Sequence, residues 1–134
     1  MSTRSIGIGI LVSSVVASAG TVLAHHSFAA QYDRDKPVTL KGTVTKVEWA
    51  NPHIYFYVDV KDASGRVVNW AIEGGTPNSL RRSGWGKESL KVGDMVTVNG
   101  SRAKNGTNLA NMRTVVLADG RRVLGGSSEG QDRQ

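Results

Sequence analysis

Apolar and polar residues alternate with a period of two through the first half of the chain, which is typical of β-strands. Residues 38–49 alternate in this way until Val44 and then resume one position out of phase. This slip predicts a strand interrupted by a β-bulge. The same period continues in residues 53–61 and, after a turn rich in small polar residues, in residues 66–73.

The second of these strands has two different faces. Phe56 and Val58 lie on an apolar face, whereas His53, Tyr55 and Tyr57 share the other face. The apolar face is expected to point into the core. The residues predicted to be buried across all strands are Val44, Phe56, Val58, Trp70, Ile72 and Val98.

The period changes after residue 73. Thr76 and Pro77 are residues that favour the start of a helix, and Gly84 favours its end, so one short helix is predicted between them. Residues 95–103 and 112–118 then read as two more strands. A hairpin at Asp119 and Gly120 precedes a short final strand over residues 121–124.

Three strands, a helix and two or three further strands predict an all-β fold with one short helix. The order matches a five- to six-stranded OB-like Greek-key barrel. A small β-sandwich or another open barrel has the same order of strands. We expect an N-terminal arm over residues 25–36, the barrel domain over residues 37–124, and a disordered tail over residues 125–134, which contains no large apolar residue.

Residues 1–24 have the pattern of a secretory signal peptide. Arg4 is followed by an uncharged, largely apolar segment, and Val22 and Ala24 are small residues at the −3 and −1 positions of a cleavage site. An uncleaved anchor helix is the alternative, but glycine and serine dilute the segment. We therefore expect cleavage after Ala24, a periplasmic or secreted protein, and no stable membrane insertion after cleavage.

Composition narrows the chemistry further. The chain has a formal net charge of +6 and no cysteine. The absence of cysteine excludes disulfides, a lipid-modified cysteine, thiolate metal sites and thiol catalysis. No phosphate-binding loop, zinc-protease motif or serine-hydrolase motif is present, so we expect a binding protein rather than an enzyme. Redox chemistry at a bound copper is the one enzymatic route left open.

Three motifs resemble a family of small exported bacterial proteins of unknown function. They are HHSF at residues 25–28, KGTVTKVEW-x-NPH at residues 41–53, and NW..EGG.PN at residues 69–78. The resemblance implies an exported, β-rich domain and draws attention to the histidines. It implies no particular activity.

The three histidines are the candidate metal ligands. After cleavage, His25 would carry a free α-amine beside its own imidazole, and the two nitrogens could chelate one ion. His53 is expected to supply a further nitrogen, and His26 lies next to the new terminus. Nitrogen-only ligation favours Cu(II), followed by Ni(II) and Zn(II). The ligand set resembles the histidine brace of copper proteins, although a solvated His25-His26 terminus is the alternative.

A non-metal binding module is the second hypothesis. Tyr55 and Tyr57 could stack against a ligand on the exposed face of the barrel. Arg81 and Arg82 could form part of a surface for an anionic envelope ligand or an acidic partner protein. Export makes nucleic acid an unexpected partner. Glu48 and Glu73 could also form a carboxylate pair, but their spacing does not require it.

Overall fold

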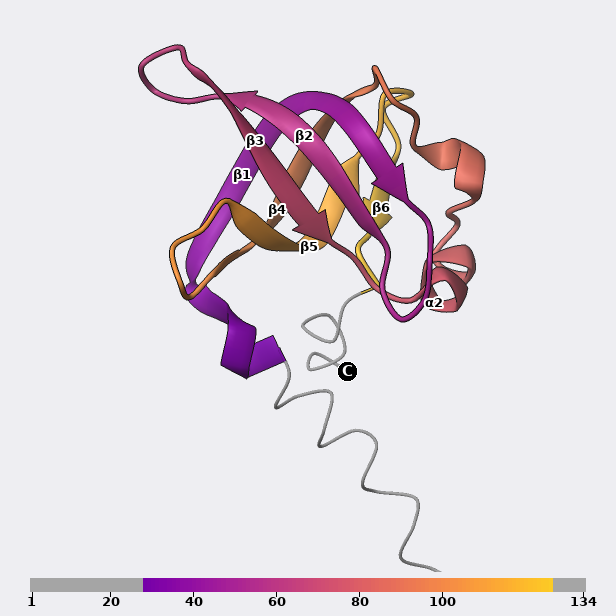
Figure 1. The fold of residues 1–134 in the computed structure, drawn as a ribbon. Helices are drawn as coiled ribbons and strands as arrows, with labels where there is room; N and C mark the ends of the chain where they lie inside the picture. Colours follow the sequence, from indigo (N-terminus) through magenta and orange to yellow (C-terminus); the bar gives the residue numbers. More distant parts are fainter. Residues whose placement is uncertain (1–27, 127–134) are drawn as a thin grey trace, which may run out of the picture.

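The computed structural model describes residues 28–126, in which six strands and short helical segments follow one another (Figure 1). A helical turn at residues 28–31 leads into the first strand. The elements that follow are β1 (Tyr32–Glu48), β2 (Tyr55–Lys61), β3 (Val67–Glu73), α2 (Pro77–Arg82), the 3-10 helix η1 (Lys87–Ser89), β4 (Met95–Ala103), β5 (Leu109–Val116) and β6 (Arg122–Leu124).

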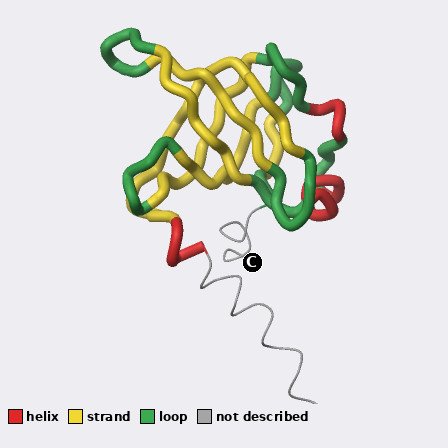
Figure 2. Tube along the Cα trace, viewed as in Figure 1, coloured by secondary structure: helices red, strands yellow, loops and turns green. Residues whose placement is uncertain are grey.

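Five of the strands close into a ring. The sheet order is β3-β2-β1-β4-β5-β6, and a short parallel pairing between β3 and β5 completes the closure. All other pairings are antiparallel, and β6 pairs with Thr114, Val115 and Val116 of β5, beyond the residues of β5 that pair with β3. Figure 2 shows the helical segments outside this strand ring. The prediction of a small OB-like barrel with a helix after the third strand is confirmed.

The long strand β1 pairs with both β2 and β4, so it must bend strongly. Its register with β2 shifts between Val44 and Lys46, where the alternation of the sequence slips, and the predicted bulge is confirmed. Gly42 lies where β1 approaches β2 closely, because a Cβ there would be 2.2 Å from the carbonyl oxygen of Asp59. The strand begins at Tyr32, inside the segment expected to be an arm.

The inward faces of the strands fill the ring with apolar side chains, as the alternation predicts. Five of the six residues predicted to be buried are so, and the core includes Val44, Ile54, Phe56, Val58, Ile72, Leu80, Val96, Val98, Met112 and Val115. Trp70 is the exception, because it is only half-buried. It precedes the three residues of β3 that pair with β5, so it lies where the ring is still open. The Arg102 guanidinium covers its ring instead, at 5.2 Å from the centroid.

The helix follows the predicted signals. The Thr76 side chain accepts a hydrogen bond from the backbone N–H of Ser79, Pro77 occupies the first turn, and Gly84 follows the end with a φ of +90°. Leu80 and Trp85 then pack into the core. This connection closes the side of the ring beside β6, where Trp85 Nε1 donates to the Leu124 carbonyl at 2.9 Å.

No helix within residues 28–126 is long and apolar enough to cross a membrane. The predicted signal peptide and residues 127–134 of the predicted tail lie outside the described residues.

The core assignment predicts a large effect of truncating Phe56, whose side chain is fully buried. Phe56→Ala should lower the free energy of unfolding by about 3–5 kcal/mol, because it removes apolar contacts and leaves a cavity. Val92→Ala is the control, since Val92 is 66% exposed, and it should change stability by no more than about 0.5 kcal/mol. Urea unfolding followed by tryptophan fluorescence measures both. Equal stabilities for the two variants would contradict the assignment of the inward face.

Candidate functional site

A group of polar side chains lies on the outer face of the barrel, at the point where β3 closes onto β5. Glu73 is the last residue of β3, and Tyr55, the first residue of β2, is paired directly with it. The loop between β1 and β2 places His53 next to Glu73, and Tyr32, the first residue of β1, also contacts Glu73. We call Tyr32, His53, Tyr55 and Glu73 the Glu73 cluster.

The carboxylate of Glu73 is the centre of this cluster. His53 Nδ1 lies 2.5 Å from Glu73 Oε1. The Tyr32 hydroxyl donates a hydrogen bond to the other oxygen, Oε2, and the Tyr55 hydroxyl is also hydrogen-bonded to the carboxylate. Because a carboxylate only accepts hydrogen bonds, the proton in the contact with His53 belongs to Nδ1. In the neutral imidazole with this tautomer, Nε2 is the nitrogen that carries a lone pair.

The burial of Glu73 makes the hydrogen bonds to its carboxylate necessary. Glu73 is 5% exposed, and an ionised carboxylate removed from water is strongly destabilising unless donors surround it. Its neighbours across the adjacent strands, Asn111 on β5 and Ser101 on β4, are also buried. Within the described part of the chain, Asn111 Oδ1 has no hydrogen-bond partner. The outer face thus holds a row of buried polar side chains, and among the described residues Asn111 Oδ1 is an acceptor without a donor.

The N-terminal segment covers this row. Phe28 and Tyr32 are both buried and form a small apolar cluster with Ala103 and Leu109, separate from the barrel core. The two rings are 5.4 Å apart between centroids. The start of the described chain is therefore packed onto the same face as Glu73.

The environment shifts the acid–base behaviour of both tyrosines. Burial, the negative charge of Glu73 and the hydrogen bond to it raise the pKa of Tyr55 to about 12. Burial, followed by the hydrogen bond and charge of Glu73, raises the pKa of Tyr32 far above its ordinary value. Both hydroxyls therefore remain protonated donors to the carboxylate at neutral pH.

The residues predicted from the sequence do not all meet. His53 and Tyr55 lie in the Glu73 cluster, but Tyr57 contacts Glu48 instead, at 3.3 Å, and lies under the Lys46 ammonium. Glu48 forms an ion pair with Lys46, whereas Glu73 contacts Tyr32 and His53, so the two carboxylates have different partners.

The two predicted arginines lie elsewhere. Arg81 and Arg82 occupy the last turn of α2, where Arg81 Nη1 donates to Asn78 Oδ1 at 3.1 Å. His25 and His26 lie outside the described residues. Tyr32 was not predicted from the sequence to belong to this site. The position of Glu73 on the outward face of its strand was a signal that pointed to this part of the barrel.

Metal binding by this cluster needs ligands from elsewhere. Among residues 28–126, no group of three or more His, Cys, Asp or Glu side chains is placed to hold a metal ion. Phe28, the first residue that the structure describes, packs beside Tyr32 of the Glu73 cluster.

Comparisons with known proteins place the chain in a family but give it no function. The model of the family of unknown function DUF6152 matches residues 12–112. A comparison with curated proteins gives no match.

The solved structures that are similar to this chain include two at low identity. TiaS in complex with an isoleucine tRNA and ATP is 22% identical, with a TM-score of 0.47, over 63% of this chain and 18% of the TiaS chain. The mitochondrial single-stranded DNA binding protein Rim1 of S. cerevisiae is 11% identical, with a TM-score of 0.48, over 61% of this chain and 92% of Rim1. At these scores neither similarity bears on function.

The shifted tyrosines predict a loss of stability in alkali. A folded-state pKa raised above the unfolded value stabilises the protein below the unfolded pKa, and this stabilisation is lost as the pH rises through the folded pKa. For Tyr55 the interval runs from 10.0 to about 12. The free energy of unfolding should fall across it, and Tyr55→Phe should make the fall shallower. Urea unfolding at several alkaline pH values measures this, and identical pH profiles for the two proteins would contradict the proposed environment.

Proposed function

Because the chain belongs to the DUF6152 family of unknown function, its activity must be inferred from its own residues, and we propose that it is an exported copper-binding protein. One Cu(II) ion binds per chain. The α-amine and imidazole of His25 hold the ion together with Nε2 of His53. His26 is a further imidazole at the same terminus.

The contact between Glu73 and His53 carries the proposal. Histidines that bind metals commonly donate their other ring N–H to a carboxylate, which fixes the tautomer and makes the ligating nitrogen more basic. Glu73 does this from a buried position, while the side chain of His53 remains 41% exposed. A histidine that merely ended a loop would not need a buried carboxylate behind it. The arrangement supports a ligand held in one orientation with its free nitrogen accessible.

The N-terminal arm supports the second half of the site. Phe28 and Tyr32 attach the chain to the outer face beside Glu73. The Tyr32 hydroxyl and His53 use the two oxygens of one carboxylate. The carboxylate of Glu73 therefore orients both the N-terminal arm and His53. In the proposed site, an arm already packed at Phe28 loses less conformational entropy when the terminus and His53 bind one ion.

The chemistry of the proposed ligands favours copper. Three nitrogen donors without thiolate or carboxylate suit the tetragonal geometry of Cu(II) better than that of Zn(II). Asn111 Oδ1, buried on the same face and unpaired, offers an acceptor for an N–H of the terminal segment. The proposal requires cleavage after Ala24, because only then is the α-amine beside the His25 imidazole.

The first test of the proposal is the identity of the mature terminus. Protein recovered from the periplasm of an expressing bacterium should have the intact mass of a chain that begins at His25. A chain that begins at Ala24 or keeps the apolar segment would separate the α-amine from the His25 imidazole, and the proposed site could not form.

The second test is metal binding by the mature protein. Isothermal titration should give one Cu(II) per chain, and electron paramagnetic resonance should show nitrogen ligation in a tetragonal field. One extra residue before His25 should weaken binding by moving the amine away, although all three histidines remain. His53→Ala should weaken binding by removing one ligand. Glu73→Gln should weaken it by about 10–100-fold through the orientation of His53.

Tyr57→Phe is the matched control, because Tyr57 lies on the same strand face but outside the Glu73 cluster. It should bind copper like the native protein. Circular dichroism checks that each variant is folded. Equal affinities in the native, extended and His53→Ala proteins would reject the metal site and favour a binding module for an anionic ligand.

A further inference from the structure

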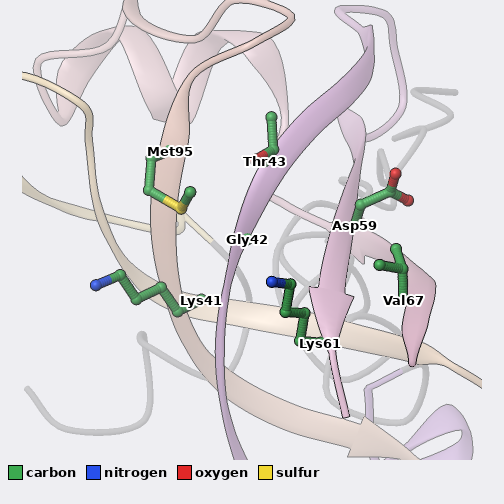
Figure 3. Close-up of a pocket in the computed structure, with 7 residues that line it drawn as sticks. All are labelled: Lys41, Gly42, Thr43, Asp59, Lys61, Val67 and Met95. Atoms are coloured by element: carbon green, nitrogen blue, oxygen red, sulfur yellow. The ribbon is translucent and has the colours of Figure 1, made fainter. Parts of the chain in front are cut away.

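A second candidate site lies on the outer face of the barrel, away from the Glu73 cluster. A groove of about 580 Å³ crosses β1, β2 and the neighbouring ends of β3 and β4. Lys41 and Lys61 lie within it, and between them the floor is the main chain at Gly42 (Figure 3). The groove is open to solvent and involves no residue of the proposed metal site.

The two lysines flank the end of the β1–β2 ladder. Gly42 pairs with Val60 at this end, and Lys41 and Lys61 are the residues next to that pair on β1 and β2. Like charges opposite each other on neighbouring strands destabilise a sheet. Within residues 28–126 neither lysine forms an ion pair. The pair therefore presents uncompensated positive charge on both sides of one strand.

The nearest acidic group does not neutralise this pair. Asp59 lines the same groove, but its carboxylate accepts a hydrogen bond from Asn69 Nδ2 at 2.8 Å. In Figure 3 the Lys61 ammonium points toward β1, whereas the Asp59 carboxylate lies on the other side of β2. An anion that reaches both lysines would be repelled by Asp59, but from the far side of the strand.

Apolar side chains flank the charged pair. Val67 is 55% exposed and Met95 is 50% exposed, and both line the groove. They are two of the four large hydrophobic residues that are exposed in the described part of the chain. The groove therefore combines apolar surface with positive charge.

We propose that this groove binds an amphiphilic oxyanion, in which a phosphate-type group contacts Lys41 and Lys61 and an attached apolar group covers Val67 or Met95. The anion supplies the counter-charge that the cross-strand pair lacks. The apolar part removes exposed hydrophobic surface from water. The proposal does not depend on copper, because none of the groove residues belongs to the Glu73 cluster.

Titration of the metal-free protein with hexyl phosphate tests the proposal. Amide resonances of Lys41, Thr43 and Lys61 should shift saturably in nuclear magnetic resonance spectra. Hexyl phosphate should bind about tenfold more tightly than inorganic phosphate, because the alkyl chain buries apolar surface. Lys41→Gln and Lys61→Gln should each weaken binding by about threefold to fivefold. Asp59→Asn should strengthen it, because a repulsive charge is removed.

Two exposed residues provide controls. Lys87→Gln changes an exposed lysine outside the groove and should leave binding unchanged. Val67→Ser combined with Met95→Ser should remove the preference for hexyl phosphate but keep the weak binding of inorganic phosphate. These surface changes should not unfold the domain. Absence of saturable shifts, or equal affinities in the Lys41→Gln, Lys61→Gln and Lys87→Gln proteins, would overturn the proposal.

The source of the oxyanion is tested separately. Vesicles of phosphatidylglycerol should capture the native protein more than the Lys41→Gln/Lys61→Gln double variant if the oxyanion is a lipid headgroup. Binding of hexyl phosphate without capture by vesicles would identify a free amphiphile. Either result supports the groove as an oxyanion site, whereas a failure of both assays rejects it.

Discussion

The burial of the Glu73 carboxylate is the constraint to which the other features of the site are tied. Glu73 ends β3, where that strand pairs with β5 to close the ring, and Tyr32 of the N-terminal segment contacts its buried carboxylate on the outer face. An ionised group there must be surrounded by donors. Tyr32 and His53, from segments far apart in the sequence, supply them. The closed barrel therefore brings together the strands and the loop that carry the site.

Much of the fold could be predicted from the sequence because its signals are local. Alternation identifies the strands, the slip after Val44 identifies the bulge, and Thr76, Pro77 and Gly84 identify the helix. Trp70 shows the limit of this reasoning. The alternation along β3 assigns Trp70 to the correct face of the strand. How far the ring closes around that face depends on the three-residue pairing of β3 with β5. This pairing joins distant strands, and no short stretch of sequence encodes it.

The candidate site could be predicted only in part, for the same reason. His53 and Tyr55 are close in sequence and are joined by the strand period. Tyr32 and Glu73 are 41 residues apart, and their contact depends on how β1 wraps past β4 before it reaches β2. Tyr57 shares the predicted face but meets Glu48 and Lys46, since a strand face is longer than one site. The sequence indicates the face of a residue more readily than its partners.

The bulge in β1 keeps the outward face of this strand continuous beside both proposed sites. Lys41 points outward before the bulge, and Glu48, paired with Tyr55, lies on the outward side after it. These two positions differ by an odd number of residues, so an unbroken strand would turn one of them inward. The extra residue between Val44 and Lys46 restores the phase. Along β2, the outer face then passes from the Glu73 cluster at Tyr55 to the lysine groove at Lys61, and one register sets the positions of both.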